Sequence, residues 1–223
     1  MWRERFSKER NGERIFDMKF YFLRHPETIA NKKGLIYGWT DYDYTEKGRE
    51  MMEEMPERIA RLSFDKIYAS PLGRAKKLAD AISERTKIPV IEDDRIKEMN
   101  FGMLEGLDFF EARKSHGDIL DKLFSDYDGF TVPQGESSLD VKKRAMAFLD
   151  EIKEEDGACL LVTHAMFIHT AMSYLLQLDP HIMWKFKIEP CMVVCVEYRE
   201  GFSVMKSMVP FEETDGFFIV DKK

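Results

Sequence analysis

An apolar run, Phe20-Tyr-Phe-Leu, ends abruptly in Arg24 and His25, and this stretch constrains the fold more than any other. Four successive apolar residues are typical of a strand that is buried on both faces, as in a parallel sheet. The carboxyl end of such a strand opens onto the crevice where α/β proteins bind ligands. Arginine has a planar fork that suits phosphate, and histidine acts as a nucleophile or proton carrier near neutral pH.

The chain continues as an alternation of strand and helix patterns. We expect further strands at 64–70, 88–92 and 159–163, and a hairpin around Glu200 and Gly201. We expect Thr45 to cap a helix that Pro56 kinks or divides, Ser70 and Pro71 to begin another, and Ser137 to cap a third. The pattern predicts an α/β fold: a three-layer α/β/α sandwich with a mostly parallel central sheet.

One domain, 18–212, accounts for this pattern. Residues 1–17 form an N-terminal extension outside the core, and 213–223 a C-terminal tail. Residues 107–132 interrupt the alternation, and we expect a small helical excursion over the active site. Its aromatic residues fit either a lid or the packing of a small subdomain. Phe124 and Tyr127 in this excursion, and Trp184 later in the chain, are candidates for shaping the substrate end of a site.

Composition excludes several classes of function. The net charge of −7 argues against a nucleic-acid partner. No apolar run is long enough to cross a membrane, and residues 1–17 lack the apolar segment of a secretory signal. Three cysteines without CxxC spacing are typical of reduced thiols, so we expect a cytoplasmic protein. The acidic run Glu92-Asp93-Asp94 has no companion ligands at regular spacing, and we expect no metal there.

Two more chemical side chains follow expected strands. Arg74 comes just after the strand at 64–70, and His164 ends the strand at 159–163. Because the carboxyl ends of parallel strands meet at one edge of a sheet, we expect Arg24, His25, Arg74 and His164 to share a crevice.

At this point the sequence resembles the histidine phosphatase superfamily, the phosphoglycerate-mutase-like proteins. The likeness runs in order from about Met18 to Ile168. Its motifs are Arg24-His25-Pro26-Glu27-Thr28 with Asn31, Gly38-Trp39-Thr40-Asp41, Ser70-Pro71-Leu72-Gly73-Arg74-Ala75, Glu98-Met-Asn-Phe101-Gly102-Met-Leu-Glu105-Gly106, Pro133-Gln-Gly135-Glu136-Ser137 and Val162-Thr163-His164.

The resemblance implies a metal-independent phosphatase without a cofactor. His25 would be the nucleophile and form a phosphohistidine, and Glu98 would be the proton donor. The phosphate-binding residues would be Arg24, Arg74, Asn31, His25 and His164, with His164 also catalytic. Substrate contacts are expected at Glu27, Thr28, Gly38, Trp39 and Ala165, while Glu105 is expected to brace a loop. The partner would be a small phosphorylated metabolite, with the oligomeric state left open.

Two positions depart from the family pattern. Pro26 replaces the usual glycine, which removes one backbone N–H from the phosphate pocket. Ala165 and Met166 stand where the family often has two glycines, so we expect a narrower pocket floor.

Alternative functions remain open. A cofactor-dependent phosphoglycerate mutase is the first alternative, although the excursion at 107–132 is short for the enclosing segments of such mutases. An α-ribazole-phosphate phosphatase is another substrate assignment. A non-catalytic phospho-ligand-binding module is the alternative from a different class.

Overall fold

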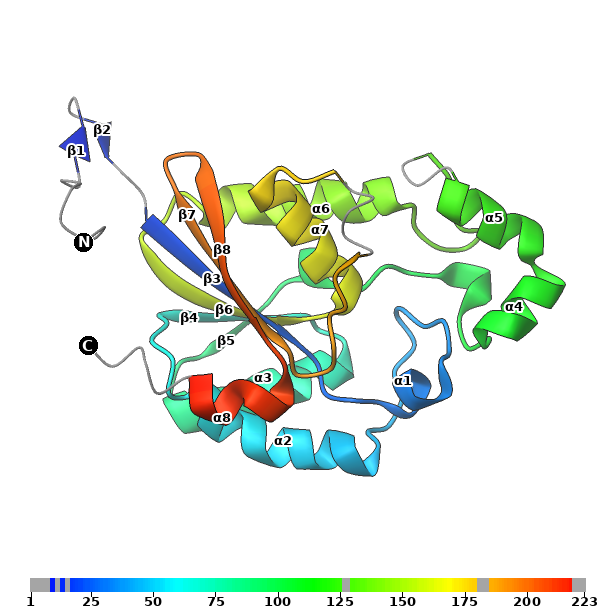
Figure 1. Ribbon diagram of the computed structural model, residues 1–223, viewed down its shortest axis with the longest axis horizontal. Coiled ribbons are helices and arrows are strands. Elements are labelled where there is room, and N and C mark those ends of the chain that lie inside the picture. The colour runs from blue at the N-terminus through cyan, green and yellow to red at the C-terminus, as the bar shows by residue number, and fades with distance from the viewer. Residues whose placement is uncertain (1–8, 11–12, 15–16, 126–128, 180–184, 218–223) are drawn as a thin grey trace.

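A mixed sheet of six strands lies at the centre of the protein (Figure 1). The computed structural model describes residues 9–10, 13–14, 17–125, 129–179 and 185–217. The strands stand in the order β5-β4-β6-β3-β7-β8. They are β3 (Asp17–Arg24), β4 (Lys66–Ala69), β5 (Val90–Glu92), β6 (Gly157–Thr163), β7 (Val193–Arg199) and β8 (Phe202–Val209). The pairs β3–β6, β4–β6 and β4–β5 are parallel, whereas the predicted hairpin of β7 and β8 adds two antiparallel pairings.

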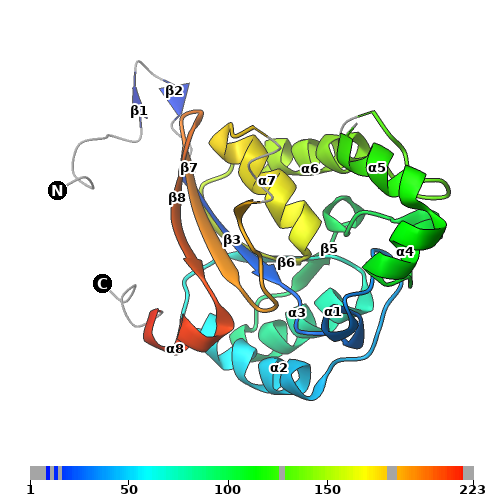
Figure 2. The same ribbon diagram turned by 45° about the vertical axis from the view of Figure 1, so that its right-hand side comes forward.

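Strand β3 is buried from both sides, as its apolar run predicts. Phe20 and Phe22 face one hydrophobic cluster, together with residues of α6 (Ser138–Ile152) and α7 (Ala165–Leu176). Tyr21 and Leu23 face the other cluster, with α2 (Glu46–Ile59) and α3 (Gly73–Thr86). Figures 1 and 2 show α6 and α7 covering one face of the sheet and α2 and α3 covering the other. The predicted three-layer sandwich is therefore confirmed.

The helix starts follow local sequence signals in two cases out of three. Thr45 caps α2 and Ser137 caps α6 in a capping box, as predicted. The cap predicted at Ser70 is wrong, because α3 begins at Gly73 and the hydroxyl of Ser70 bonds a histidine from another strand instead. Helix α2 continues past Pro56 to Ile59, so Pro56 does not divide it. Pro56 lies in the last turn of this helix.

The excursion consists of two short helices, α4 (Phe109–Ser115) and α5 (Gly117–Ser125). They lie together at one end of the molecule, in green in Figures 1 and 2. Ala112 and Leu120 from these helices are buried in a third cluster with Met99 and Leu104. Phe110, by contrast, is 84% exposed. The helical excursion thus packs in a small cluster that it shares with residues outside it, among them Val141 of α6 and Met166 of α7. The Phe124 side chain, Tyr127 and Trp184 lie outside the described parts.

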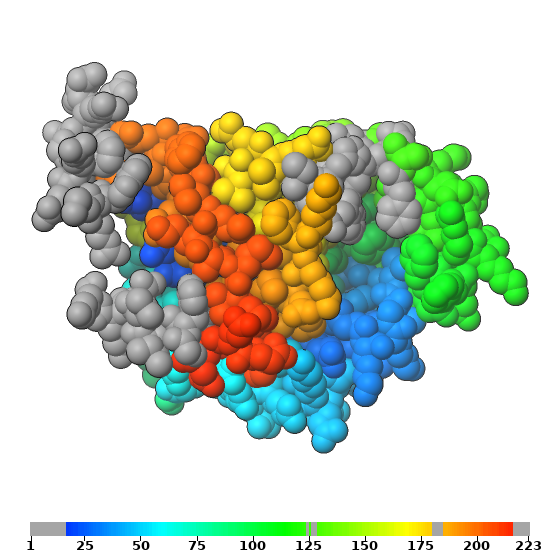
Figure 3. Space-filling view, viewed as in Figure 1, coloured from blue at the N-terminus to red at the C-terminus, as the bar shows by residue number. Residues whose placement is uncertain are grey.

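Short elements complete the described structure: β1 (Glu9–Arg10), β2 (Glu13–Arg14), α1 (Ile29–Lys33), η1 (Asp94–Ile96), η2 (Gly102–Leu104), η4 (Phe211–Glu213) and α8 (Thr214–Phe217). β1 and β2 pair only with each other. Figure 3 shows the red residues of η4 and α8 against the cyan residues of α2. Arg58 of α2 donates to the carbonyl of Phe211 (2.6 Å) and to the hydroxyl of Thr214 (2.7 Å), which fixes this segment. In the described ranges, no helix has both the length and the apolar character needed to cross a membrane.

Candidate active site

The candidate site lies at the carboxyl ends of three strands, β4, β6 and β3, which are neighbours in the sheet. Arg24 ends β3 and His25 follows it, while His164 follows β6. Arg74 lies in the first turn of α3, beyond the end of β4. The centroids of the His25 and His164 rings are 5.2 Å apart. Residues separated by more than a hundred positions in the sequence therefore meet at one edge of the sheet.

His25 is held in the form that a nucleophile needs. Its Nδ1 lies 2.8 Å from the carbonyl oxygen of Pro26, which can only accept, so Nδ1 carries the proton and Nε2 keeps its lone pair. The side chain is buried, and burial lowers the pKa of His25 well below its usual value, helped by the charges of Arg74 and Arg24. The imidazole is therefore neutral near pH 7.

His164 lies beside it as a second buried imidazole. Its Nε2 is 2.8 Å from the hydroxyl of Ser70, and its Nδ1 is buried without a protein partner. Burial, followed by the charge of Arg74, lowers the pKa of His164 well below its usual value. The sequence did not show that Ser70 would orient this ring, because the residues are 94 positions apart.

Arg74 is held by the loop that follows α1 and precedes α2. Its Nη1 bonds the carboxylate of Asp41 (2.8 Å), and its Nη2 bonds the carbonyl of Gly38. Its guanidinium lies over the ring of Tyr37, with 4.8 Å from Cζ to the centroid. The Nε of Arg74 is buried and has no hydrogen-bond partner among the described residues, so the edge of the guanidinium that carries Nε is left for an anion.

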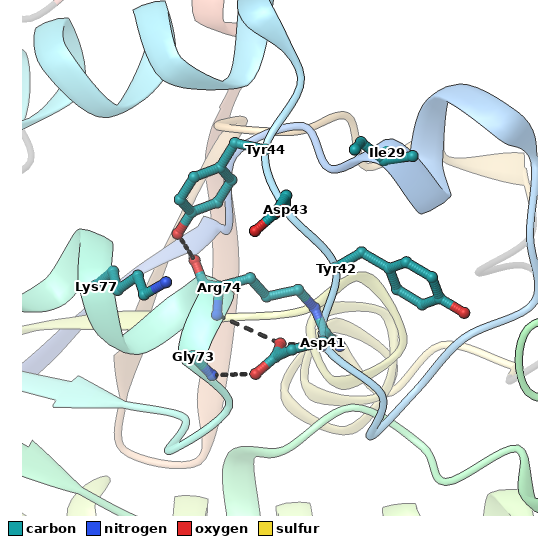
Figure 4. Close-up of a pocket in the computed structure, with 8 residues that line it drawn as sticks. All are labelled: Ile29, Asp41, Tyr42, Asp43, Tyr44, Gly73, Arg74 and Lys77. Atoms are coloured by element: carbon teal, nitrogen blue, oxygen red, sulfur yellow. Dashed lines mark hydrogen bonds and ion pairs between the residues drawn. The ribbon is translucent and has the colours of Figure 1, made fainter.

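Asp41 has a second contact, with the start of α3. Figure 4 shows its carboxylate accepting from the backbone N–H groups of Gly73 (2.7 Å) and Arg74 (3.4 Å), in addition to its bond with the Arg74 guanidinium. A pocket of about 340 Å³ opens beside this ion pair, and Tyr42, Asp43 and Lys77 are among the residues that line it. Asp41 thus joins the loop to the helix that carries Arg74, a role that its place in a motif did not reveal.

Arg24 is braced by the segment before β7. Its Nη1 donates to the carbonyl of Ile188 (2.6 Å), and its backbone N–H donates to Met192 (3.2 Å). Its Nε is buried without a protein partner, as in Arg74. No sequence signal indicates that residues 188–192 support the site.

Glu98 is a buried carboxyl group beside these cations. Its Oε1 accepts from the N–H of Met99 (3.0 Å) and its Oε2 from the N–H of Met166 (3.3 Å). Burial raises the pKa of Glu98, against the opposing effect of those backbone N–H groups and of Arg74. The raised pKa favours a protonated carboxyl group under mildly acidic conditions, as a proton donor requires.

Asn31 is oriented by the cap of helix α1. Both the N–H and the hydroxyl of Thr28 donate to Asn31 Oδ1, each at 3.0 Å. The hydroxyl of Thr28 is thereby used as a donor, so the Tyr37 hydroxyl, 2.9 Å away, must donate to it. This network fixes the amide oxygen of Asn31 against Thr28, so Nδ2 is the amide atom of Asn31 that can donate to a ligand.

The other expected contact residues have structural partners. Glu27 accepts from the hydroxyl of Thr45 (2.6 Å). Trp39 is 43% exposed and donates from Nε1 to the carbonyl of Glu98 (3.0 Å). Ala165 is the half-buried first residue of α7.

Gly38 marks a close approach of two backbones. A Cβ at this position would lie 1.7 Å from the carbonyl oxygen of Met99, so only glycine fits. The carboxylate of Glu105 bonds the N–H groups of Trp39 and Thr40, both at 2.8 Å. Glu105 therefore braces the loop that holds Arg74.

Metal ligation finds no support in the described ranges, where no group of three or more His, Cys, Asp or Glu side chains is placed to hold an ion.

Comparison with known proteins identifies the class to which this fold and site belong. The model of the histidine phosphatase superfamily (branch 1) matches residues 20–209, and the chain belongs to this family.

Particular relatives narrow the comparison. A protein named probable phosphoglycerate mutase, from Yersinia enterocolitica, is 28% identical over 82% of this chain and 86% of its own. A structure of phosphoserine phosphatase from Entamoeba histolytica, in complex with 3-phosphoglyceric acid, is 30% identical with a TM-score of 0.75, covering 88% of this chain and 99% of that one. An α-ribazole phosphatase from Shigella flexneri has a TM-score of 0.77 at 22% identity, covering 86% and 96%, a likeness that shows the fold.

Proposed function

We propose that this protein hydrolyses phosphate monoesters of small metabolites through a phosphohistidine on His25. The observation that carries the proposal is the pair of buried imidazoles, with ring centroids 5.2 Å apart, between two arginines. Among the described residues, the buried nitrogens Nε of Arg24, Nε of Arg74 and Nδ1 of His164 have no hydrogen-bond partner. The two arginine N–H groups would donate to phosphoryl oxygens, and His164 would do so in the tautomer that carries its proton on Nδ1. A neutral nucleophile surrounded by cations suits attack on an anionic ester.

The reaction proceeds in two transfers. The lone pair on His25 Nε2 forms a bond to phosphorus while the ester P–O bond breaks, and Glu98 gives its proton to the departing alkoxide. Water then attacks the phosphohistidine, Glu98 takes a proton from that water, and inorganic phosphate leaves. Arg24, Arg74, His164 and the Nδ2 of Asn31 hold the phosphoryl oxygens throughout, so the scheme requires no metal and no cofactor.

The relatives support a small phosphorylated metabolite as the substrate class. They include a phosphoserine phosphatase in complexes with phosphoserine and with 3-phosphoglyceric acid. We therefore place the ester on a small hydroxy acid or amino acid. Such substrates carry a carboxylate as well as a phosphate.

The test is to trap the intermediate. Enzyme mixed rapidly with a ³²P-labelled ester and quenched in alkali should carry a label that is stable to alkali and lost in acid, as a phosphoramidate is. The His25→Ala variant should carry none, while His116→Ala, which changes a histidine of the excursion, should be labelled like the wild type. Turnover without a His25-dependent label would overturn the proposal. Absence of turnover on a panel of small phosphate esters would favour a binding module instead.

A phosphoglycerate mutase is the second candidate, because one relative at 28% identity bears that name. A mutase must keep water away from the phosphoenzyme while the substrate reorients, and the described part of the excursion provides two short helices, α4 and α5. Net isomerisation of 3-phosphoglycerate that depends on 2,3-bisphosphoglycerate would favour the mutase. Release of inorganic phosphate without isomerisation would favour the phosphatase.

A further inference from the structure

The segment Pro133–Ser137 has no part in the chemistry above, yet it lies directly against the backbone that carries Glu98. The N–H of Glu136 donates to the carbonyl of Asn100 (2.9 Å), and its carboxylate accepts from the N–H of Asn100 (2.8 Å). A Cβ on Gly135 would lie 2.4 Å from the Asn100 carbonyl oxygen, so this approach requires glycine. The two segments are therefore fixed to each other two residues after Glu98.

Arg144, on helix α6, completes this attachment with every N–H of its guanidinium. Its Nε and Nη2 bond the two carboxylate oxygens of Glu136, at 3.0 and 3.1 Å. Its Nη1 donates to the carbonyls of Arg95 (2.8 Å) and Lys97 (2.6 Å), and its Nη2 also donates to the carbonyl of Glu98 (2.9 Å). A guanidinium has five N–H donors, and all five are used.

The acceptors of Arg144 explain why an arginine is needed here. Arg144 donates to three main-chain carbonyls of one short segment, residues 95–98, and to the carboxylate of Glu136. The side chains of Arg144 and Glu136 are only 15% and 19% exposed, so the pair is largely withdrawn from water. A lysine has no planar fork and offers three donors, so it cannot satisfy this set.

These bonds act on Glu98 through its backbone. The Glu98 carbonyl accepts from Arg144 on one side and from Trp39 Nε1 on the other. Within the described residues, the Glu98 carboxylate accepts from the N–H groups of Met99 and Met166, while Arg144 donates to the Glu98 carbonyl and not to its carboxylate. Arg144 thus fixes where the carboxyl group stands without touching it.

We propose that Arg144, paired with Glu136, is a positioning residue that holds Glu98 at the distance from the substrate oxygen at which proton transfer works. This inference rests on the proposed function, since it assigns the support of the proposed proton donor. Misplacement of a catalytic group by about 1 Å costs up to about 10²-fold in rate. The cost should fall on substrates whose leaving group needs a proton.

The test compares two substrates in the Arg144→Lys and Glu136→Gln variants. We expect kcat/KM for phosphoserine to fall at least about tenfold and kcat/KM for p-nitrophenyl phosphate, a good leaving group, to fall less than about threefold. Adding Arg144→Lys to Glu98→Gln should cause no further loss on phosphoserine, because the group being positioned is already gone. The matched control is Arg85→Lys: Arg85 is an arginine of α3 that pairs with Glu57 of α2, outside the segments that Arg144 and Glu136 hold together.

The outcomes separate this inference from the proposed function. If Glu98→Gln loses activity selectively on phosphoserine but neither Arg144→Lys nor Glu136→Gln does, the positioning role is wrong and the proton donor stands. Equal losses on both substrates in Glu98→Gln would overturn the proton donor itself. Glu136→Gln keeps the shape of the side chain, so it decides the question even if Arg144→Lys does not fold. An additive loss in the Arg144→Lys/Glu98→Gln variant would also overturn the positioning role.

Discussion

At the scale of single residues, the site depends on two groups whose protonation states are set by burial. His25 must be neutral to attack, and burial with the charges of Arg74 and Arg24 lowers the pKa of His25 well below 6.5. Glu98 must be protonated to donate, and burial raises the pKa of Glu98 above 4.5. The two shifts run in the directions that give the acid and the nucleophile the protonation states each needs at the same pH.

The pH dependence of kcat/KM follows from these directions. As pH falls through 6.5, His25 stays neutral, so we expect no loss of activity from its protonation in that range. As pH rises through the raised pKa of Glu98, the carboxyl group loses the proton that it must donate, and kcat/KM for phosphoserine should fall. Measured between pH 4 and 9, the optimum should be acidic. The fall on the alkaline side should be absent in Glu98→Gln; if that variant keeps it, another group causes it.

The leaving group tests Glu98 directly. In Glu98→Gln we expect kcat/KM for phosphoserine to fall by about 10²–10⁴-fold, the usual contribution of a positioned proton donor. The p-nitrophenolate leaving group needs little protonation, so activity on p-nitrophenyl phosphate should be largely kept. Steady-state assays of both esters at one pH are sufficient. Equal losses on both esters would assign Glu98 a structural role.

At the scale of elements, we expect Asp41, in the loop before α2, to support the binding of the phosphoryl group rather than the proton transfer. Asp41 joins this loop to α3 by bonding the Gly73 N–H and the Arg74 guanidinium. In Asp41→Ala we expect KM to rise about tenfold on phosphoserine and p-nitrophenyl phosphate alike, because in the proposed mechanism Arg74 would contact the phosphoryl group that both share. Loss of the carboxylate that accepts from the Gly73 N–H at the start of α3 should also lower the free energy of unfolding by about 1 kcal/mol. Asp43→Ala, in the same loop, is the matched control.

An Asp41→Ala effect confined to phosphoserine would contradict this role, since it would mean that the loop contacts the rest of the substrate instead. A change in kcat without a change in KM would contradict it as well.

The elements also show how far the sequence alone could predict this molecule. Strand β3, the caps at Thr45 and Ser137, and the brace at Glu105 depend on local patterns or motifs, and the structure agrees with them. Ser70 has an equally good local pattern, but its hydroxyl is used by His164 from a neighbouring strand. The Arg24–Ile188 bond joins residues 164 positions apart, and nothing near either residue indicates it. Contacts between residues far apart in the sequence decide most of the roles that the motifs do not predict, including the roles of Tyr37 and Arg144.

At the scale of the whole molecule, an acidic chain with a net charge of −7 concentrates cations at one edge of its sheet. Neutral histidines are buried among them: His25, His164 and, on α7, His169. Burial and the charge of Arg24 lower the pKa of His169 to about 4. The native protein therefore keeps these imidazoles unprotonated at a mildly acidic pH at which imidazoles exposed to water become protonated.

This arrangement predicts an acid-sensitive fold. Each of these histidines has a folded pKa below its unfolded value of about 6.5, so below that pH the unfolded chain binds protons that the native protein does not. The free energy of unfolding should thus be highest above pH 6.5 and should fall as pH drops to 5, with His169 alone contributing about 2 kcal/mol of that loss. Glu98 acts in the opposite direction, since its raised pKa keeps a proton on the native state. The carboxylates of Asp93, Asp140 and Asp150 have lowered pKa values and lose their stabilising effect only below about pH 4, outside this window.

Urea unfolding at pH 7.5, 6.5, 5.5 and 5.0 measures the loss. His169→Gln should reduce the difference between pH 7.5 and 5.0 by about 2 kcal/mol, because glutamine takes up no proton in the unfolded chain. His116→Gln serves as the control, since it removes a histidine of the excursion. A His169→Gln variant with the slope of the wild type would show that His169 is protonated in the native state. Stability that stays constant down to pH 5 would contradict the prediction for the other buried imidazoles too. Neutral His25, on which the proposed attack depends, would then be in doubt as well.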